Sequence, residues 1–246
     1  AIKFDPNNEN AYNIRGICYY NLEKLDLAIK DFNKAIKINP NYSSAYLNRG
    51  MAYYYIDEYE KALQDLTQAI KLDPEYLDAY YNRGTVLNAM EQYSLAINDF
   101  NKVIELDPND IDGYFMRAIT YRNSKDYSNA IKDFTKCIEM DSTAAYIYYH
   151  RAIAYRFSKD FDNALNDLNK AIDLYPDYYL AYNMLGNIYF DQEQYDVALN
   201  YYQKAIELNP DYVVAYYNVA NIYYEQGNYS AAKNYFNKIV ILDPNG

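Results

Sequence analysis

Few side chains in this chain of 246 residues could carry out bond-making chemistry. His150 is the only histidine, so a histidine-centred triad has one candidate base, and no serine or cysteine near it belongs to a nucleophile motif. No Cys-x-x-Cys, His-Glu-x-x-His or EF-hand spacing occurs, and the glycines lie too far apart to form a phosphate-binding loop. We therefore expect no catalysis, no cofactor and no metal site in this chain.

The two cysteines, Cys18 and Cys137, are expected to be small buried fillers rather than a disulfide. The absence of a disulfide framework favours the cytoplasm, and no signal peptide is visible. Because the chain begins with Ala-Ile-Lys, without an initiator methionine, we expect it to be a fragment whose native compartment is unknown.

The charge balance bears on the class of partner. Lysine and arginine total 23 against 34 aspartates and glutamates, a formal net charge of −11. An acidic chain repels the phosphates of nucleic acids and of anionic membrane surfaces, and no apolar run is long enough to span a bilayer. We expect neither nucleic acid nor a membrane as the partner.

One small basic cluster stands out against this acidic background: Arg122, Arg156 and His150. Its guanidinium groups could receive a carboxylate or phosphate of a partner through bidentate hydrogen bonds. The alternative is that Asp112 or Asp126 neutralises the two arginines, or that they are simply solvated.

The elements that position these side chains follow from the prolines, which fall on one grid with a spacing of 34 residues. Ser142 replaces proline at the single vacant point of this grid, which is otherwise occupied by Pro6, Pro40, Pro74, Pro108, Pro176, Pro210 and Pro244. The grid defines seven repeats, 9–42, 43–76, 77–110, 111–144, 145–178, 179–212 and 213–246, and we number the places in each from one to thirty-four. Residues 1–8 are expected to be the end of a preceding repeat's second helix.

Each repeat has the same pattern of large and small residues. Place four is tyrosine, place eight is glycine or alanine, place twenty is alanine, and place twenty-four is phenylalanine, leucine or tyrosine. Large residues three and four apart make one helical stripe, and the small places let two antiparallel helices approach closely. Since a single pair cannot bury both of its faces, we expect an all-α array whose neighbouring pairs share one core.

On these residues the chain resembles the tetratricopeptide repeat (TPR) family, over all seven copies. The resemblance implies a right-handed superhelix, an α-solenoid of helix pairs, with the first helices lining a concave groove and the second helices the convex face. The chain departs from the family's small residue at place twenty-seven, where Val103, Cys137 and Ile239 predict local repacking.

Places seven and twenty-three hold charged residues in most repeats. Place seven is usually apolar in the TPR family. Place seven is Arg15, Arg49, Arg83, Arg117 and Arg151, then Leu185 and Val219; place twenty-three is Asp31, Asp65, Asp99, Asp133 and Asp167, then Tyr201 and Tyr235. Because both places change type at the same boundary, we predict that these residues pair between helices. Apolar and aromatic packing is expected to replace the pair in repeats six and seven.

The groove is expected at places two, five, six, nine, twelve and thirteen of the first helices. Tyrosine offers contact area at low rotamer entropy and asparagine offers donors and acceptors to a peptide backbone. An equal alternative is that these side chains pack on the neighbouring first helix. The candidate partner-binding residues are Tyr20, Asn48, Tyr54, Tyr55, Tyr81, Asn82, Phe115, Arg122, Tyr149, His150, Arg156, Asn183, Asn187, Tyr217, Asn218 and Asn221.

Two known TPR binding modes fit this groove poorly. The clamp for chaperone C-termini needs lysines, and none lies at the groove places, although Asn183, Asn187 and Asn218 match its amides. The asparagine ladder of the nucleocytoplasmic sugar transferase needs asparagine at place six throughout, and Met116 and Met184 are among the residues that interrupt it.

We predict a non-catalytic interaction module that holds an extended or helical peptide segment of a protein partner. Two alternatives stay open. The chain could be the targeting arm of an enzyme whose catalytic domain lies elsewhere. It could also be a scaffold that stacks head to tail through uncapped ends, where Ile239, Val240 and Leu242 lack a following repeat.

Overall fold

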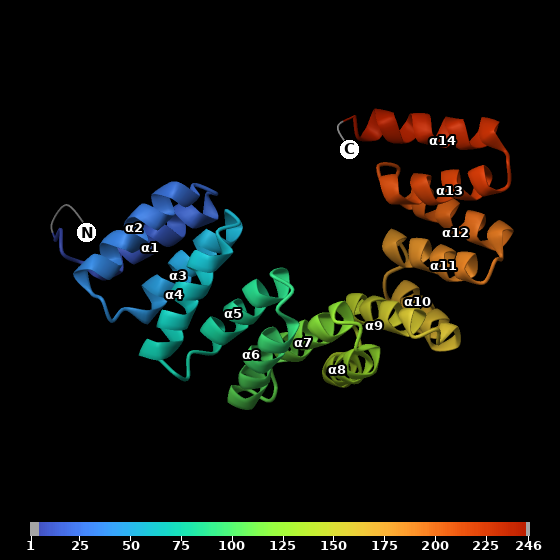
Figure 1. Cartoon of the computed structure of the whole chain (residues 1–246). Coiled ribbons are helices and arrows are strands. Elements are labelled where there is room, and N and C mark those ends of the chain that lie inside the picture. The colour runs from blue at the N-terminus through green and yellow to red at the C-terminus, as the bar shows by residue number, and fades with distance from the viewer. Residues whose placement is uncertain (1–4, 245–246) are drawn as a thin grey trace. The chain divides into compact units, whose positions relative to one another are not determined.

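The computed structural model describes residues 5–244, and every regular element in that part of the chain is an α-helix (Figure 1). The helices form pairs, which confirms the expected all-α architecture. The first helices of the pairs are α1 (Glu9–Asn21), α3 (Ser43–Tyr55), α5 (Leu77–Ala89), α7 (Ile111–Asn123), α9 (Ala145–Phe157), α11 (Tyr179–Asp191) and α13 (Val213–Glu225). The second helices are α2 (Leu25–Ile38), α4 (Tyr59–Leu72), α6 (Tyr93–Leu106), α8 (Tyr127–Met140), α10 (Phe161–Leu174), α12 (Tyr195–Leu208) and α14 (Tyr229–Leu242).

The chain divides into two compact units, Ala1–Asp126 with helices α1 to α7 and Tyr127–Gly246 with helices α8 to α14. Within each unit, every helix packs against the next one along the chain. The single array over residues 9–246 stays a prediction. The helical tail expected at residues 1–8 lies partly outside the described residues, and from Asp5 to Asn8 the chain is a turn whose last residue caps α1.

The turn inside each pair is built in the same way throughout the chain. The residue at place fifteen has a positive φ, between 58° at Glu23 and 72° at Gly227. This left-handed conformation ends a helix by letting the following amides bond to its last carbonyls, as when Gln194 N–H donates to the carbonyl of Tyr189 at 2.8 Å. Only repeat seven has glycine there.

The joint between pairs is set by the residue that precedes proline, which is aspartate or asparagine except at Tyr175-Pro176. The residue before proline is extended, with φ −139° and ψ 95° at Asp73, and α4 therefore ends at Leu72. The tyrosine at place four fastens some of these joints, since Tyr80 Oη donates to the carbonyl of Pro74 and Tyr216 Oη to that of Pro210. Tyr148 Oη donates in the same way to the carbonyl of Ser142, so the one joint that lacks proline keeps its hydrogen bond.

Close packing inside a pair depends on the contact between places eight and twenty-four. A methyl group on Gly16 would lie 2.5 Å from Cε1 of Phe32, and one on Gly84 would lie 2.9 Å from Cζ of Phe100. Both rings are fully buried. The small residue is therefore required by the ring that packs on it.

The larger residue at place twenty-seven of repeat three has a specific compensation. Val103 is fully buried, and Gly113 of α7 lies against it, where a methyl group would come within 2.8 Å of the valine Cγ1. Gly113 stands at place three, where the other repeats have alanine or isoleucine. The repacking expected around Val103 is thus a loss of volume at Gly113.

The predicted pairing of arginine with aspartate is confirmed in four repeats. Each pair is bidentate: Nε and Nη2 of the arginine donate to the two carboxylate oxygens at 2.6 to 2.8 Å in Arg15–Asp31, Arg49–Asp65, Arg83–Asp99 and Arg151–Asp167. All four aspartates are buried. The hydrogen bond with Asp99 raises the pKa of Arg83 above its ordinary value. The pair of Arg117 and Asp133 involves helices of both units and stays a prediction.

A further bond ties the arginines of repeats two to five to the preceding repeat. The third nitrogen, Nη1, donates to the side chain at place twenty-five of that repeat. The acceptors are Asn33 for Arg49, Thr67 for Arg83, Asn101 for Arg117 and Thr135 for Arg151. The arginine therefore joins three helices.

Repeats six and seven replace this arrangement with apolar and aromatic contacts, as predicted. Leu185 and Val219 are buried at place seven. The rings of Tyr189 and Tyr201 stack with centroids 5.3 Å apart and an angle of 5° between their planes, and Tyr223 stacks on Tyr235 at 5.8 Å.

Candidate functional site

The candidate binding residues lie on the first helices, at the groove places, and we call this surface the first-helix face. In the first unit it includes Tyr20 of α1, Asn48, Tyr54 and Tyr55 of α3, Tyr81 and Asn82 of α5, and Phe115 and Arg122 of α7. In the second unit it includes Tyr149, His150 and Arg156 of α9, Asn183 and Asn187 of α11, and Tyr217, Asn218 and Asn221 of α13. Asn183 is buried and most of the others are half-buried.

Apolar side chains are exposed on this face in both units. Tyr55 is 60% and Tyr217 52% exposed. They are accompanied by Ile14, Ile17, Phe157, Val214 and Tyr224, which are also exposed at groove places. Water-exposed rings and aliphatic chains at helical spacing form a surface that association with a partner would cover.

The first unit also has a hollow on this face, of about 170 Å³. Its lining comes from α1 and α3, with Phe32 of α2 behind them: Ile17, Tyr20, Asn21, Phe32, Asn48 and Met51. Beside it, the rings of Tyr20 and Tyr55 meet edge to face at 5.4 Å. Burial raises the pKa of Tyr20, so its hydroxyl stays protonated and can donate a hydrogen bond.

Several asparagines bond to each other instead of pointing to solvent. Asn48 Nδ2 donates to Asn13 Oδ1 at 3.0 Å, and Asn218 Nδ2 donates to Asn183 Oδ1 at 3.0 Å. Asn183 is therefore a correction to the list of candidate binding residues, because it is only 4% exposed and serves to join α11 to α13. The alternative reading, packing on the neighbouring first helix, holds for this residue.

The other amides of the candidate set differ in what they can offer a partner. Asn187 accepts from the hydroxyl of Tyr202 at 2.9 Å and from Asn218 at 3.3 Å. Asn82 donates to the carbonyl of Asp78 in its own helix. The side-chain amide of Asn221, on α13, makes no hydrogen bond within the part of the chain that the structure describes, so its oxygen and nitrogen can bond with water or a peptide.

Contacts between neighbouring first helices follow a spacing of 35 residues, one more than the repeat. Place five contacts place six of the next repeat, as in Asn13–Asn48 and Asn183–Asn218. Place twelve contacts place thirteen, as in Tyr20–Tyr55 and in Asn88–Asn123, whose amides are 3.3 Å apart. Sequence reasoning placed Asn13 in the groove but missed this rule, although a search for polar pairs 35 residues apart would have found it.

Arg156 is explained by the same rule. Its Nε and Nη2 donate to the carboxylate of Asp191 at 2.7 and 3.0 Å, and both side chains are about one-fifth exposed. We expected a free guanidinium, or neutralisation by Asp112 or Asp126. Both expectations for Arg156 are wrong, because Asp191 lies opposite it on the next first helix.

The two other members of the basic cluster lie in different units. In the first unit, Arg122 Nη2 is 3.4 Å from Oδ1 of Asn123. In the second, the ring of His150 stacks on Phe134 at 6.1 Å and meets Tyr149 at 5.2 Å, so it is part of an aromatic group. The combined basic cluster stays a prediction.

The tyrosines at place thirty-four support the ends of the first helices. Tyr178 lies 5.3 Å from Tyr149, and Tyr212 lies 4.9 Å from Tyr179, measured between ring centroids. Burial raises the pKa of both Tyr178 and Tyr212 to about 12. These hydroxyls are therefore neutral at physiological pH.

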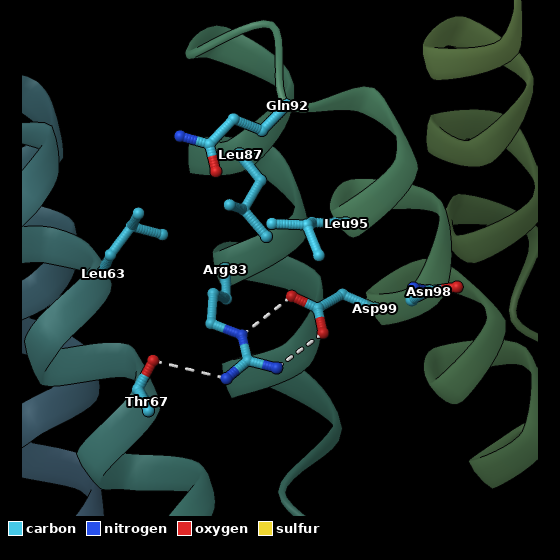
Figure 2. A pocket seen from close by; sticks show the side chains of 8 residues that line it. All are labelled: Leu63, Thr67, Arg83, Leu87, Gln92, Leu95, Asn98 and Asp99. Carbon is cyan, nitrogen blue, oxygen red and sulfur yellow. Dashed lines mark hydrogen bonds and ion pairs between the residues drawn. The ribbon is translucent and has the colours of Figure 1, made fainter.

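A second and larger hollow, of about 420 Å³, lies away from the first-helix face (Figure 2). Its walls come from α4, α5 and α6. Leu63, Leu87 and Leu95 form its apolar side, and Thr67, Arg83 and Asp99 form its polar side. Sequence reasoning missed it. The signal was present, since Leu87 is the one residue at place eleven that is not tyrosine.

No group of three or more histidine, cysteine, aspartate or glutamate residues within residues 5–244 is placed to hold a metal ion. Over the same residues, none of the helices combines the length and the apolar character needed to cross a bilayer.

Comparison with solved structures finds several similar chains. YrrB, described as a TPR protein with an unusual peptide-binding site, is 27% identical, with a TM-score of 0.62 over 74% of this chain and 93% of its own. The C-terminal part of a TPR repeat-containing protein from Cytophaga hutchinsonii is 22% identical, with a TM-score of 0.69 over 94% of this chain and 95% of its own. MamA from Desulfovibrio magneticus is 19% identical, with a TM-score of 0.65 over 69% of this chain and 96% of its own. A search of curated proteins finds no match.

Family models match along most of the chain. The model described as tetratricopeptide repeat matches residues 9–42, 43–76, 77–110 and 213–245, and related models of the same description match residues 100–132 and 145–178. A model described as TPR repeat matches residues 186–227. With its helix pairs, its 34-residue period and these matches, the chain belongs to the tetratricopeptide repeat family.

Proposed function

We propose that this chain is a non-catalytic interaction module that holds a peptide segment of a protein partner on its first-helix face. The observation that carries the proposal is the set of exposed apolar side chains at groove places, with Tyr55 and Tyr217 more than half exposed. The peptide-binding site described for YrrB, which is 27% identical, supports it.

Each unit contributes a different kind of contact. The hollow beside Tyr20 and Asn48 is large enough for an aliphatic side chain, and the edge-to-face rings next to it give a rigid apolar wall. On α13 the exposed Tyr217 and Tyr224 flank the unbonded Asn221, whose amide can pair with a peptide main chain. An acidic group of the partner is not expected at Arg156, because Asp191 already occupies its guanidinium.

The test is a selection of peptides from a random library on the intact chain, followed by affinity measurement on two variants. The first carries Tyr55→Ser and Tyr217→Ser on the first-helix face. The control carries Leu27→Ser and Ile241→Ser, which are also exposed but lie on the second helices α2 and α14. We expect about tenfold weaker binding by the first variant and no change in the control.

Equal binding by both variants, or equal loss, would show that the peptide does not use this face. The alternative of a targeting arm for an enzyme uses the same surface and predicts the same result.

A second proposal is head-to-tail association of copies of this chain, which the exposure of α1 and α14 favours. Cys18, which the sequence analysis predicted to be buried, is exposed, whereas place ten is buried in every other repeat. At the other end, Val240 is 64% and Ile241 70% exposed. Asn237 of α14 also occupies place twenty-five, where it could accept the third bond of Arg15 of another copy, as Asn33 does for Arg49.

Sedimentation velocity on two variants tests this stacking. Cys18→Glu blocks one end and Val240→Asp the other, so each variant alone should be monomeric at concentrations where the intact chain associates. An equimolar mixture should give a species of two chains and nothing larger. Association of either variant by itself would contradict a head-to-tail contact.

A further inference from the structure

Repeat three lacks an aromatic ring that every other repeat has. Place eleven is tyrosine in six repeats and leucine only at Leu87. Leu87 is buried among Ala96 and Phe100, and its shorter side chain leaves open the space that a tyrosine ring would take next to Arg83.

Arg15, Arg49 and Arg151 show what this ring does. The guanidinium carbon lies 5.6 and 5.9 Å from the rings of Tyr12 and Tyr19 at Arg15, and 5.6 and 5.9 Å from those of Tyr46 and Tyr53 at Arg49. Arg151 lies 5.8 Å from both Tyr148 and Tyr155. Within the described residues, Arg83 meets a single ring, that of Tyr80 at 5.7 Å. One aromatic partner of this guanidinium is missing.

The hollow of about 420 Å³ occupies this position (Figure 2). Leu95 on its wall is 52% exposed and stands at place nineteen. In repeat two that place is Lys61, whose ammonium lies 5.5 Å from the ring of Tyr53. Repeat three thus replaces a ring and a cation by two leucines, which makes the wall apolar and open to solvent.

The hydrogen bonds of Arg83 decide which chemistry fits. Its Nε and Nη2 donate to Asp99 and its Nη1 donates to Thr67, so each of its three nitrogens already makes one hydrogen bond in the guanidinium plane. A carboxylate or phosphate would also be repelled by Asp99. The face of the guanidinium remains, and an aromatic ring binds that face.

We propose that this hollow is a docking site for an aromatic side chain presented by a peptide segment of a protein partner. The ring takes the place that tyrosine occupies in the other repeats, between Arg83 and the leucines at 63 and 95. The amides of Gln92 and Asn98 lie at the lining and can bond to the main chain on either side of the ring. This site is separate from the first-helix face.

The experiment uses N-acetyl-tryptophanamide as the aromatic probe and N-acetyl-leucinamide as the aliphatic control. The readout is the Nε–H resonance of Arg83 in the intact chain, assigned with Arg83→Lys. We expect the aromatic probe to shift this resonance saturably at millimolar concentration, with at least about fivefold higher affinity than the aliphatic control. Equal affinity of the two probes would overturn the aromatic assignment, and no shift would overturn the site.

Leu87→Tyr is the matched variant, because it restores the residue that six other repeats have. The tyrosine should fill the hollow and lower the affinity for the aromatic probe about tenfold, while the circular dichroism spectrum shows an unchanged helical fold. Tyr53→Leu should open an equivalent hollow at Arg49, so that the Arg49 Nε–H resonance now responds to the probe. An undiminished response at Arg83 in Leu87→Tyr would refute the proposal, whichever result Tyr53→Leu gives.

Discussion

Arg49, Arg83 and Arg151 each make hydrogen bonds to two different repeats, and this explains why a charged group is kept in a packed interior. Two bonds reach the aspartate of its own repeat and the third reaches the repeat before it. A buried ion pair alone contributes little net stability, because desolvation of both charges opposes their attraction. The third bond adds a link between repeats that an apolar side chain could not make.

The ion pair of repeat five gives a direct test. Asp167→Ala leaves Arg151, which is 16% exposed, without its carboxylate and should lower the free energy of unfolding by about 3 kcal/mol. The double change Arg151→Leu with Asp167→Tyr copies repeat six, and the new ring can stack on Tyr155 as Tyr201 stacks on Tyr189. We expect the double variant to lose less than half as much stability in a urea melt. Equal losses would mean that the pair is not replaceable by packing.

At the level of elements, the turn inside each helix pair contains a strained residue in six repeats. Side chains other than glycine are disfavoured at positive φ by about 1 kcal/mol, and Glu193 is exposed at φ 62°. Gly227 occupies the same place in repeat seven without that cost. These turns are therefore sites where stability can be gained without touching the core.

Glu193→Gly should raise the free energy of unfolding by about 0.5 kcal/mol, after the greater freedom of glycine in the unfolded chain is subtracted. The control is Asn200→Gly, on the exposed side of α12, which should lower it by a similar or larger amount. Thermal melts of both variants decide the matter. A loss of stability in Glu193→Gly would show that the turn is not strained.

The helix pairs and the arginine–aspartate pairs could be predicted from the sequence, because both repeat with one period and each member has the same residue type in several copies. The partner of Arg156 could not, since its contact with Asp191 follows the 35-residue spacing, which depends on how neighbouring first helices lie together. The burial of Asn183 was missed for the same reason. The hollow at Leu87 depends on a single residue that departs from the repeat pattern. Its effect becomes clear only from the structure of repeat two, where the tyrosine at the same place, Tyr53, packs on Arg49.

On the scale of the whole molecule, burial is distributed unevenly between the second helices. In α10 four residues are buried, Ala164, Asp167, Leu168 and Ala171, whereas in α14 the one buried residue is Ala232. In a repeat array each helix is stabilised by its neighbours, so a helix with less burial opens more often.

Native-state hydrogen exchange should therefore show the amides of α14 exchanging at least about tenfold faster than those of α10. At low concentration, where copies do not associate, the difference should be largest. A rise in α14 protection with protein concentration would point to stacking of copies. Uniform protection across both helices would mean that the array unfolds as one cooperative block.

The contact of Val103 with Gly113 also limits how such a chain can grow by tandem duplication. A second copy of repeat two could be inserted after the first, because its Arg49 would find Thr67 as acceptor and its Ala45 would meet the small Ala69. A second copy of repeat three would fit less well, since Val103 would then meet Ala79 instead of glycine, and a methyl group at that position comes within 2.8 Å of the valine Cγ1. One methyl group thus makes repeat four a better neighbour for repeat three than another copy of repeat three.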